Sequence, residues 1–204
     1  MFYYRLFSVV FHLIAATLVY GLAYQLTKQW FASALAGTLY LVHPIQTSAV
    51  TYLAQRYEVV AAMFIMACAY SYVRFRQEGS KRWLVGTVVL ALAAILSKET
   101  ALIVLPWLAV IEFLLGARIT RRQILYSLPL LVAGAAFALN GIFGKGTTLL
   151  YTSWPRYMRS QGTVITQYLQ LIVYPREQFL YYDFRPLESF SWTAAGNWVL
   201  VLSI

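Results

Sequence analysis

Charged residues, cysteine and histidine are all scarce in this chain of 204 residues. Only 11% of the residues are charged and 61% are hydrophobic, whereas an ordinary soluble domain carries about a quarter charged residues. This composition excludes a soluble globular domain and indicates an integral membrane protein. The single cysteine, Cys68, excludes an intrachain disulfide and a cysteine-based metal site. Because Cys68 lies within an apolar run, we expect it to pack in the protein core.

The two histidines, His12 and His43, lie far apart in the sequence and have no cluster of carboxylates nearby. This pattern predicts no metal site. His12 lies inside the first apolar stretch, where a hydrogen bond between helices is its expected role. The net charge of +9 does not indicate a nucleic-acid partner, because the basic residues lie at the ends of apolar stretches.

Apolar stretches follow one another along most of the chain. They cover roughly residues 6–26, 30–43, 57–75, 83–97, 101–116 and 124–142, and a seventh begins near Trp192. Several are shorter than the roughly 20 residues that cross a bilayer core, so polar flanks must extend them or the turns must be recessed in the membrane. The first stretch lacks the features of a cleaved signal peptide and predicts a retained helix. We therefore expect an all-α, polytopic bundle of six to seven membrane helices, with residues 1–204 forming a transmembrane domain within a larger membrane domain.

Basic residues in short loops predict the orientation of the chain. The turns at 74–82 and 118–122 are rich in Arg and Lys and are assigned to the cytoplasmic side. Alternate crossings then place Lys28 inside and place Met1, residues 43–56, Lys98 with Glu99, and the segment 143–192 outside. That outer segment is itself basic, which weighs against the assignment. The arrangement brings the polar clusters to one outer face.

The polar stretch "HPIQTSAVTYLAQR", residues 43–56, separates two apolar runs. Pro44 is expected to end the preceding helix, with His43 at its last turn. Arginine is suited to bind phosphate or carboxylate through two hydrogen bonds, and ionisable residues at membrane depth indicate function. Arg56, Lys98 and His43 thus form a candidate anion site. The alternatives are an interfacial anchor for Arg56, with which Glu58 is associated by its position in the sequence, and a structural His43. For Lys98 they are a salt bridge with Glu99 or a snorkelling side chain that only marks a helix end.

Two further polar features concern the second half of the chain. The segment 143–192 contains an amphipathic stretch from Val164 to Val173, which is expected to stop at Pro175 as an interfacial helix, and it is dense in tyrosine. Within it, Asp183 and the neighbouring Tyr182 are candidates for orienting a polyhydroxylated ligand. Glu112, by contrast, is expected to pair with a basic residue of the 118–122 turn and to be structural.

Four of these features follow one another along the chain: His12, then "HPIQTSAVTYLAQRYE", then "LSKETALIVLP", then "TQYLQLIVYPREQFLYYDF". Together they resemble the bacterial relatives of the transmembrane and tetratricopeptide-repeat O-mannosyltransferases, which are polytopic glycosyltransferases of the GT-C superfamily. The resemblance covers nearly the whole chain. In two respects it departs from the family. Ser48 stands where the family usually has an acid, and the family's first helix and the outer loop with its catalytic aspartates have no counterpart. We therefore expect a piece of a larger protein, or a protein without its catalytic loop.

The resemblance implies a GT-C-like fold in a bacterial inner membrane and transfer of a sugar from a polyprenyl-phosphate donor to a hydroxyl acceptor on the periplasmic, outer face. Arg56 and Lys98, supported by His43, would bind the donor phosphate. Whether this chain is itself an enzyme stays open, since Glu99, Glu58 and Asp183 are weak substitutes for the family's base. No cofactor beyond the donor is implied.

The implied partners are membrane lipid, the lipid-linked sugar, and a protein acceptor or partner membrane subunits. The alternative function is a non-catalytic GT-C-like scaffold or lipid-binding subunit of a complex. A transporter is disfavoured because no internal repeat is visible in the sequence.

Overall fold

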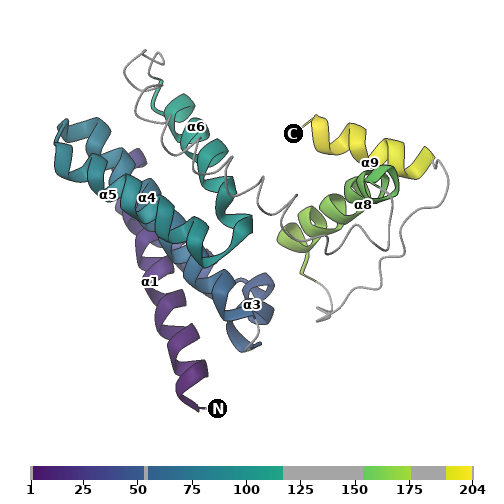
Figure 1. Ribbon diagram of the computed structural model, residues 1–204, viewed down its shortest axis with the longest axis horizontal. Helices are drawn as coiled ribbons and strands as arrows, with labels where there is room; N and C mark the ends of the chain where they lie inside the picture. The colour runs from purple at the N-terminus through teal and green to yellow at the C-terminus, as the bar shows by residue number, and fades with distance from the viewer. Residues whose placement is uncertain (1, 53–54, 117–153, 176–191, 204) are drawn as a thin grey trace. The chain divides into compact units, whose positions relative to one another are not determined.

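The computed structural model describes residues 2–52, 55–116, 154–175 and 192–203, and every regular element in these ranges is helical (Figure 1). The predicted all-α fold class is confirmed for them. The chain divides into two compact units, Met1–Asn140 and Gly141–Ile204, which are described separately below. The apolar stretch predicted at 124–142 lies outside the described residues.

The first unit is built from long helices joined by short turns. Its elements are α1 (Phe2–Thr27), α2 (Trp30–Val42), η1 (Pro44–Gln46), α3 (Thr47–Thr51), α4 (Arg56–Glu78), α5 (Lys81–Ser97), η3 (Glu99–Ile103) and α6 (Val104–Leu114). Helix α2 ends at Val42, with His43 as its extended C-cap residue just before Pro44, as predicted, because proline cannot continue a helix. Gly79 ends α4 with a φ of 66°, a conformation that only glycine adopts without cost.

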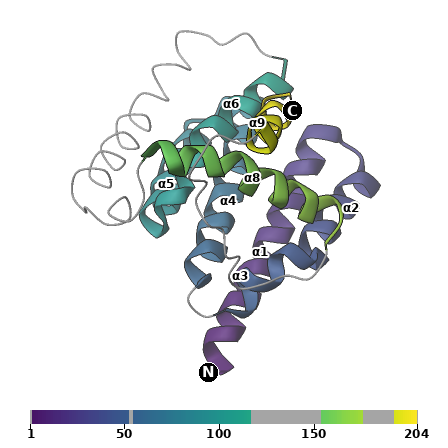
Figure 2. The same ribbon diagram turned by 90° about the vertical axis from the view of Figure 1, so that its right-hand side faces the viewer.

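The long helices alternate in direction, so their ends gather in two groups. Figure 2 shows α4 between α1 and α5. At one end, Arg56 lies over the ring of Tyr4, and at the other Gln77 Nε2 donates to the carbonyl oxygen of Gln25 at 3.1 Å. Helices α1 and α4 are therefore parallel, and α5 returns antiparallel to α4. We call the two groups of helix termini the Arg56 end and the Gly79 end.

The core of this unit combines small and polar side chains with larger aliphatic ones such as Val104 and Ile111, while many other large apolar side chains face outward. Cys68 is fully buried and its Sγ lies 3.4 Å from the Thr87 carbonyl oxygen, which confirms its predicted core position. At Gly37, a Cβ atom would lie 3.0 Å from the Tyr20 Cβ, so α1 and α2 touch backbone to side chain. Phe31 is 66% exposed and Leu96 is 78% exposed. Small residues inside and large apolar residues outside are typical of helices that pack within lipid.

Two of the described helices are long and apolar enough to cross a membrane, Tyr3–Thr27 and Arg56–Glu78. The predicted number of six to seven membrane helices is therefore not confirmed. Helix α2 has 13 residues, or about 20 Å at 1.5 Å per residue, against a hydrocarbon core of about 30 Å. Pro44 fixes this short length. The apolar helix Thr100–Leu114 is also shorter than a full crossing.

The second unit is described as a pair of helices, α8 (Trp154–Val173) and α9 (Trp192–Leu202). Helix α8 ends before Pro175 and α9 begins at Trp192, as predicted. Asn197 Nδ2 donates to Thr163 Oγ1 at 3.1 Å across the pair. Several exposed side chains near the end of α8 are apolar or aromatic, namely Tyr168, Ile172 and Val173.

Close packing in this helix pair gives a stability prediction with a matched control. A Cβ atom at Gly162 would lie 2.8 Å from Trp198 Cδ1, whereas at Gly196 it would meet nothing within 4 Å. Gly162→Ala is expected to push the helices apart at a cost of about 1–3 kcal/mol. Gly196→Ala is expected to stabilise α9 by about 0.5–1 kcal/mol. Hydrogen exchange of the α8 amides measures both changes, and equal protection in the two variants would contradict the packing.

Candidate functional site

The Arg56 end brings together predicted site residues from two separate segments, the start of α4 and the end of α5. Lys98, the residue that caps α5, forms an ion pair through its Nζ with the Glu58 carboxylate in the first turn of α4. The sequence associated Glu58 with Arg56 and associated Lys98 with Glu99. The structure instead joins Glu58 to Lys98 across the α4–α5 interface, because the antiparallel course of α5 returns Lys98 to the start of α4. The side chain of Glu99 lies outside the described part of the structure.

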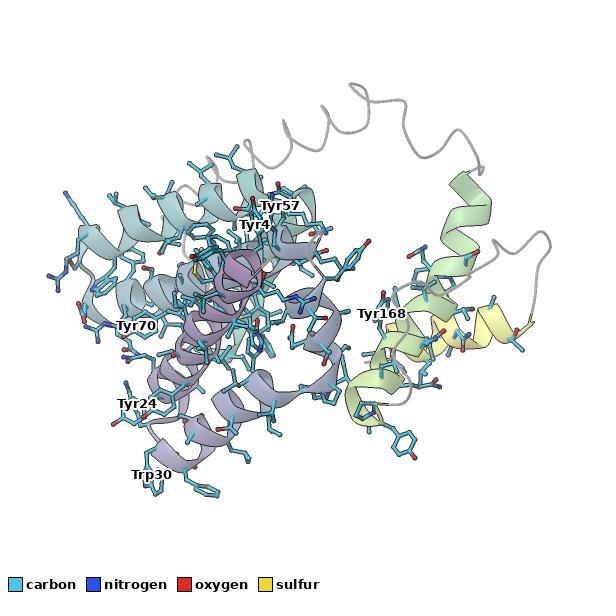
Figure 3. The ribbon with its side chains drawn as sticks, turned by 90° about the horizontal axis from the view of Figure 1, so that it is seen from below. Tyr4, Tyr24, Trp30, Tyr57, Tyr70 and Tyr168 are labelled. Carbon is cyan, nitrogen blue, oxygen red and sulfur yellow. The ribbon has the colours of Figure 1, made fainter. Side chains whose placement is uncertain are left out.

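Arg56 is held by aromatic side chains rather than by a carboxylate. Its Nη2 donates to the Tyr57 hydroxyl at 3.1 Å, and its guanidinium carbon lies 5.1 Å from the Tyr57 ring centroid and 5.4 Å from that of Tyr4. Figure 3 shows Tyr4 and Tyr57 close together at this end. Within the described residues Arg56 takes part in no ion pair with a carboxylate. The cation is thus positioned, and no carboxylate in the described part of the chain neutralises its charge.

Tyr4 and Tyr57 are site residues that the sequence interpretation missed. Both are about half exposed, as expected for tyrosines whose rings are partly buried and whose hydroxyls reach polar surroundings. Aromatic faces attract a guanidinium by about 0.5–2 kcal/mol, most when water is excluded. The signal for Tyr57 was its position next to Arg56. Tyr4 gave no local signal, because it reaches Arg56 only through the parallel packing of α1 and α4.

His43 has a described role in the backbone of the turn. Its Nδ1 accepts a hydrogen bond from the Ile45 amide at 3.2 Å and thereby caps η1. This cap supports the predicted part of His43 and Pro44 in shaping the turn. His12 Nε2 lies 3.1 Å from the Leu41 carbonyl oxygen, so its N–H donates from α1 to α2. The predicted interhelical hydrogen bond of His12 is confirmed.

The structure does not describe the remaining predicted ligands. Asp183 and Tyr182 lie outside the described residues. Within the described ranges, no group of three or more His, Cys, Asp or Glu side chains is placed to hold a metal ion. Beside the Glu58–Lys98 ion pair, the described residues give the Arg56 end the guanidinium of Arg56 and tyrosine hydroxyl groups, which suit the binding of an anionic oxygen.

A second polar cluster, buried in this case, lies toward the Gly79 end. Glu112 on α6 is 6% exposed and forms an ion pair with Arg76 of α4, and the Tyr72 hydroxyl donates to its Oε2 at 2.7 Å. The expected partner of Glu112 was a basic residue of the 118–122 turn, which lies outside the described residues. That pairing stays a prediction, and the described partners of Glu112 come from α4, so that the cluster joins α4 to α6.

Comparison with known proteins identifies the family. The family model described as dolichyl-phosphate-mannose-protein mannosyltransferase matches residues 1–142, a range that includes the whole Arg56 end. The chain belongs to this family. Membership confirms the predicted resemblance and makes the chain a member of a family of membrane glycosyltransferases.

The relatives of this mannosyltransferase-family chain are themselves named protein O-mannosyl-transferases. Protein O-mannosyl-transferase Tmtc1 of Drosophila melanogaster is 35% identical over 99 residues, which cover 48% of this chain and 12% of that protein. Tmtc2 of the same organism is 33% identical over 119 residues, 55% of this chain and 13% of that protein. Human TMTC3 is 30% identical over 141 residues, 68% of this chain and 14% of that protein. The chain thus spans a small part of each relative, and no solved structure matches it.

Proposed function

We propose that the Arg56 end binds the phosphate of a polyprenyl-phosphate sugar, and that the protein transfers this sugar to a hydroxyl of an acceptor at the periplasmic face of a bacterial inner membrane. The observation that carries the proposal is the environment of Arg56. Its guanidinium is fixed by Tyr4 and Tyr57 and takes part in no ion pair within the described residues. The names of the relatives, protein O-mannosyl-transferases, support mannose as the sugar and protein as the acceptor.

The proposed reaction is a substitution at the anomeric carbon of the sugar. The acceptor oxygen forms the new glycosidic bond while the bond to the carrier phosphate breaks, and the electron pair of that bond remains on the phosphate. Fixed cations stabilise this developing charge better than mobile water does. Arg56 supplies the cation. Lys98 lies at the same end of the bundle, where the Glu58 carboxylate offsets its charge.

A carboxylate must also accept the proton of the acceptor hydroxyl. Glu58 is the weakest of the predicted candidates because its carboxylate is already bound to Lys98. Glu99 and Asp183 keep this role as proposals. The donor phosphate enters as substrate, and the proposed steps involve no additional cofactor.

A non-catalytic scaffold or lipid-binding subunit is the second candidate function. It is favoured by the structural roles of two predicted phosphate ligands, since Lys98 ties α5 to α4 through Glu58 and His43 caps η1. In this case the Arg56 end would bind a lipid phosphate, or a partner membrane subunit, without catalysing transfer.

The two functions are separated by measuring binding and transfer on the same samples. The purified chain in lipid nanodiscs is titrated with polyprenyl-phosphate mannose, and transfer of labelled mannose to a peptide containing serine and threonine is then assayed. Saturable binding with transfer is the expected result for the enzyme. Binding without transfer supports the lipid-binding subunit, and a wild-type chain that does not bind contradicts both phosphate-site functions.

A further inference from the structure

The turn between α4 and α5, at the Gly79 end, contains an excess of positive charge. Arg74 and Arg82 both form ion pairs with the single carboxylate of Glu78, at 3.5 Å in the case of Arg82. Trp83 Nε1 donates to the same carboxylate at 2.6 Å. The neighbouring Lys81 takes part in no ion pair within the described residues. One negative charge therefore faces three positive charges.

Trp83 holds this cluster together and indicates its depth in the membrane. The guanidinium carbons of Arg74 and Arg82 lie 5.1 and 5.6 Å from the Trp83 ring centroid. Tryptophan is enriched at the level of the lipid headgroups, where one edge of the ring is apolar and the other meets polar groups. The Arg82 side chain is 75% exposed, so its guanidinium is accessible at this level.

An apolar track begins one turn from Arg82 on the same face of α5. The exposed apolar residues of this helix are spaced by three or four positions: Val85, Val89, Leu92 and Leu96. This spacing aligns side chains along one face, and Arg82 continues the series. The track from Val85 to Leu96 extends about 16 Å at 1.5 Å per residue, close to half of a hydrocarbon core of about 30 Å.

We propose that the α4–α5 turn binds an anionic phospholipid. Arg82 and Lys81 bind the headgroup phosphate, and one acyl chain lies along the track from Val85 to Leu96 (Figure 1 shows the α4–α5 hairpin). A neutral headgroup leaves the surplus cations uncompensated, whereas phosphatidylglycerol supplies one net negative charge. The predicted cytoplasmic position of this turn matches the leaflet where juxtamembrane basic clusters attract anionic lipid. The site is separate from the proposed donor site, because it lies at the opposite end of α4 and α5.

The test compares the affinities for phosphatidylglycerol and phosphatidylcholine by native mass spectrometry of the detergent-solubilised chain. Each cation near an anionic lipid contributes about 1 kcal/mol, or about a fivefold change in affinity. The double variant Lys81→Gln/Arg82→Gln is therefore expected to bind phosphatidylglycerol about 25-fold more weakly, with a smaller loss for phosphatidylcholine, whose phosphate charge is offset by its own choline cation. Val89→Asn, on the exposed track, is expected to weaken both lipids without changing the preference between them.

Lys28→Gln is the matched control, because it removes one cation at the same end of the bundle, where Lys28 binds Gln25 and lies over Tyr24. It should leave the lipid preference unchanged. Equal affinity of the wild type for the two lipids would overturn the proposal. A loss in Lys28→Gln as large per charge as in the double variant would do the same, because it would show general attraction rather than a site. Displacement of the lipid by inorganic phosphate alone would assign the site to free phosphate and would also reject the proposal.

Discussion

Arg56→Ala is expected to weaken binding of polyprenyl-phosphate mannose about 10- to 150-fold, since a hydrogen bond to a charged group contributes about 1.5–3 kcal/mol. The variant removes the cation that Tyr4 and Tyr57 position. Because little else depends on the Arg56 side chain, folding should be unaffected. Titration of the donor into wild type and variant in nanodiscs measures the change, and a thermal unfolding curve verifies that the variant is folded.

Two conservative variants separate charge from geometry at the same site. Arg56→Lys keeps the charge but lacks the planar fork and its stacking on tyrosine, so only part of the affinity should return. Tyr57→Phe removes the hydroxyl that accepts from Nη2 at 3.1 Å and keeps the aromatic face, so a loss of a few-fold is expected. If Arg56→Lys bound as tightly as wild type, a simple point charge would suffice and the positioning by tyrosine would be unimportant.

Arg5→Ala serves as the control, because Arg5 is exposed and belongs to the first turn of α1, beside Tyr4. It removes the same charge close to the proposed site and should leave donor binding within about twofold of wild type, less than one charge-assisted hydrogen bond is worth. Lys98→Met tests the shared cation. Because Glu58 already offsets Lys98, its loss should weaken binding less than Arg56→Ala does. Equal losses in Arg5→Ala and Arg56→Ala would contradict a specific site.

The sequence was sufficient to predict the features that depend on local chemistry. Pro44 and Pro175 marked the ends of α2 and α8, and the apolar run around Cys68 indicated a buried position. The alternation of apolar stretches also predicted that residues 43–56 and Lys98 share one end of the bundle. The contacts of Arg56 with Tyr4 and of Lys98 with Glu58 confirm that shared end.

Pairing between residues distant in the sequence was not predictable in the same way. An ion pair depends on the rotation and axial shift of two packed helices, and apolar periodicity fixes neither to within one residue. Glu58 was therefore associated with Arg56, its near neighbour, although the structure gives it Lys98. A different factor limited the prediction of the number of membrane helices. Composition identifies apolar stretches, but the length of each helix depends on where its turns begin.

Glu112→Leu is expected to destabilise the first unit by about 3–5 kcal/mol, because it leaves the charge of Arg76 without its partner in the bundle. Glu112 is 6% exposed and Arg76 is 21% exposed. Because Arg76 can turn toward polar surroundings and regain part of the lost stability, we expect a loss near about 3 kcal/mol. Tyr72→Phe removes only the hydroxyl that donates to Oε2 at 2.7 Å and should cost about 1 kcal/mol. Unfolding in mixed micelles, monitored by circular dichroism, measures both.

The double variant Arg76→Met/Glu112→Leu distinguishes a buried charge from lost packing. Replacing both members of a buried ion pair by apolar side chains of similar size is often neutral or stabilising, so it should recover most of the stability lost in Glu112→Leu. Glu78→Gln is the matched control, because Glu78 is likewise paired with arginine, in its case Arg74 and Arg82, but is 32% exposed, and exposed pairs contribute about 0–1 kcal/mol. A double variant no more stable than Glu112→Leu would show that the cost comes from packing between α4 and α6. Recovery of stability in the double variant would show that the cost of Glu112→Leu comes from the unpaired charge of Arg76 in the bundle.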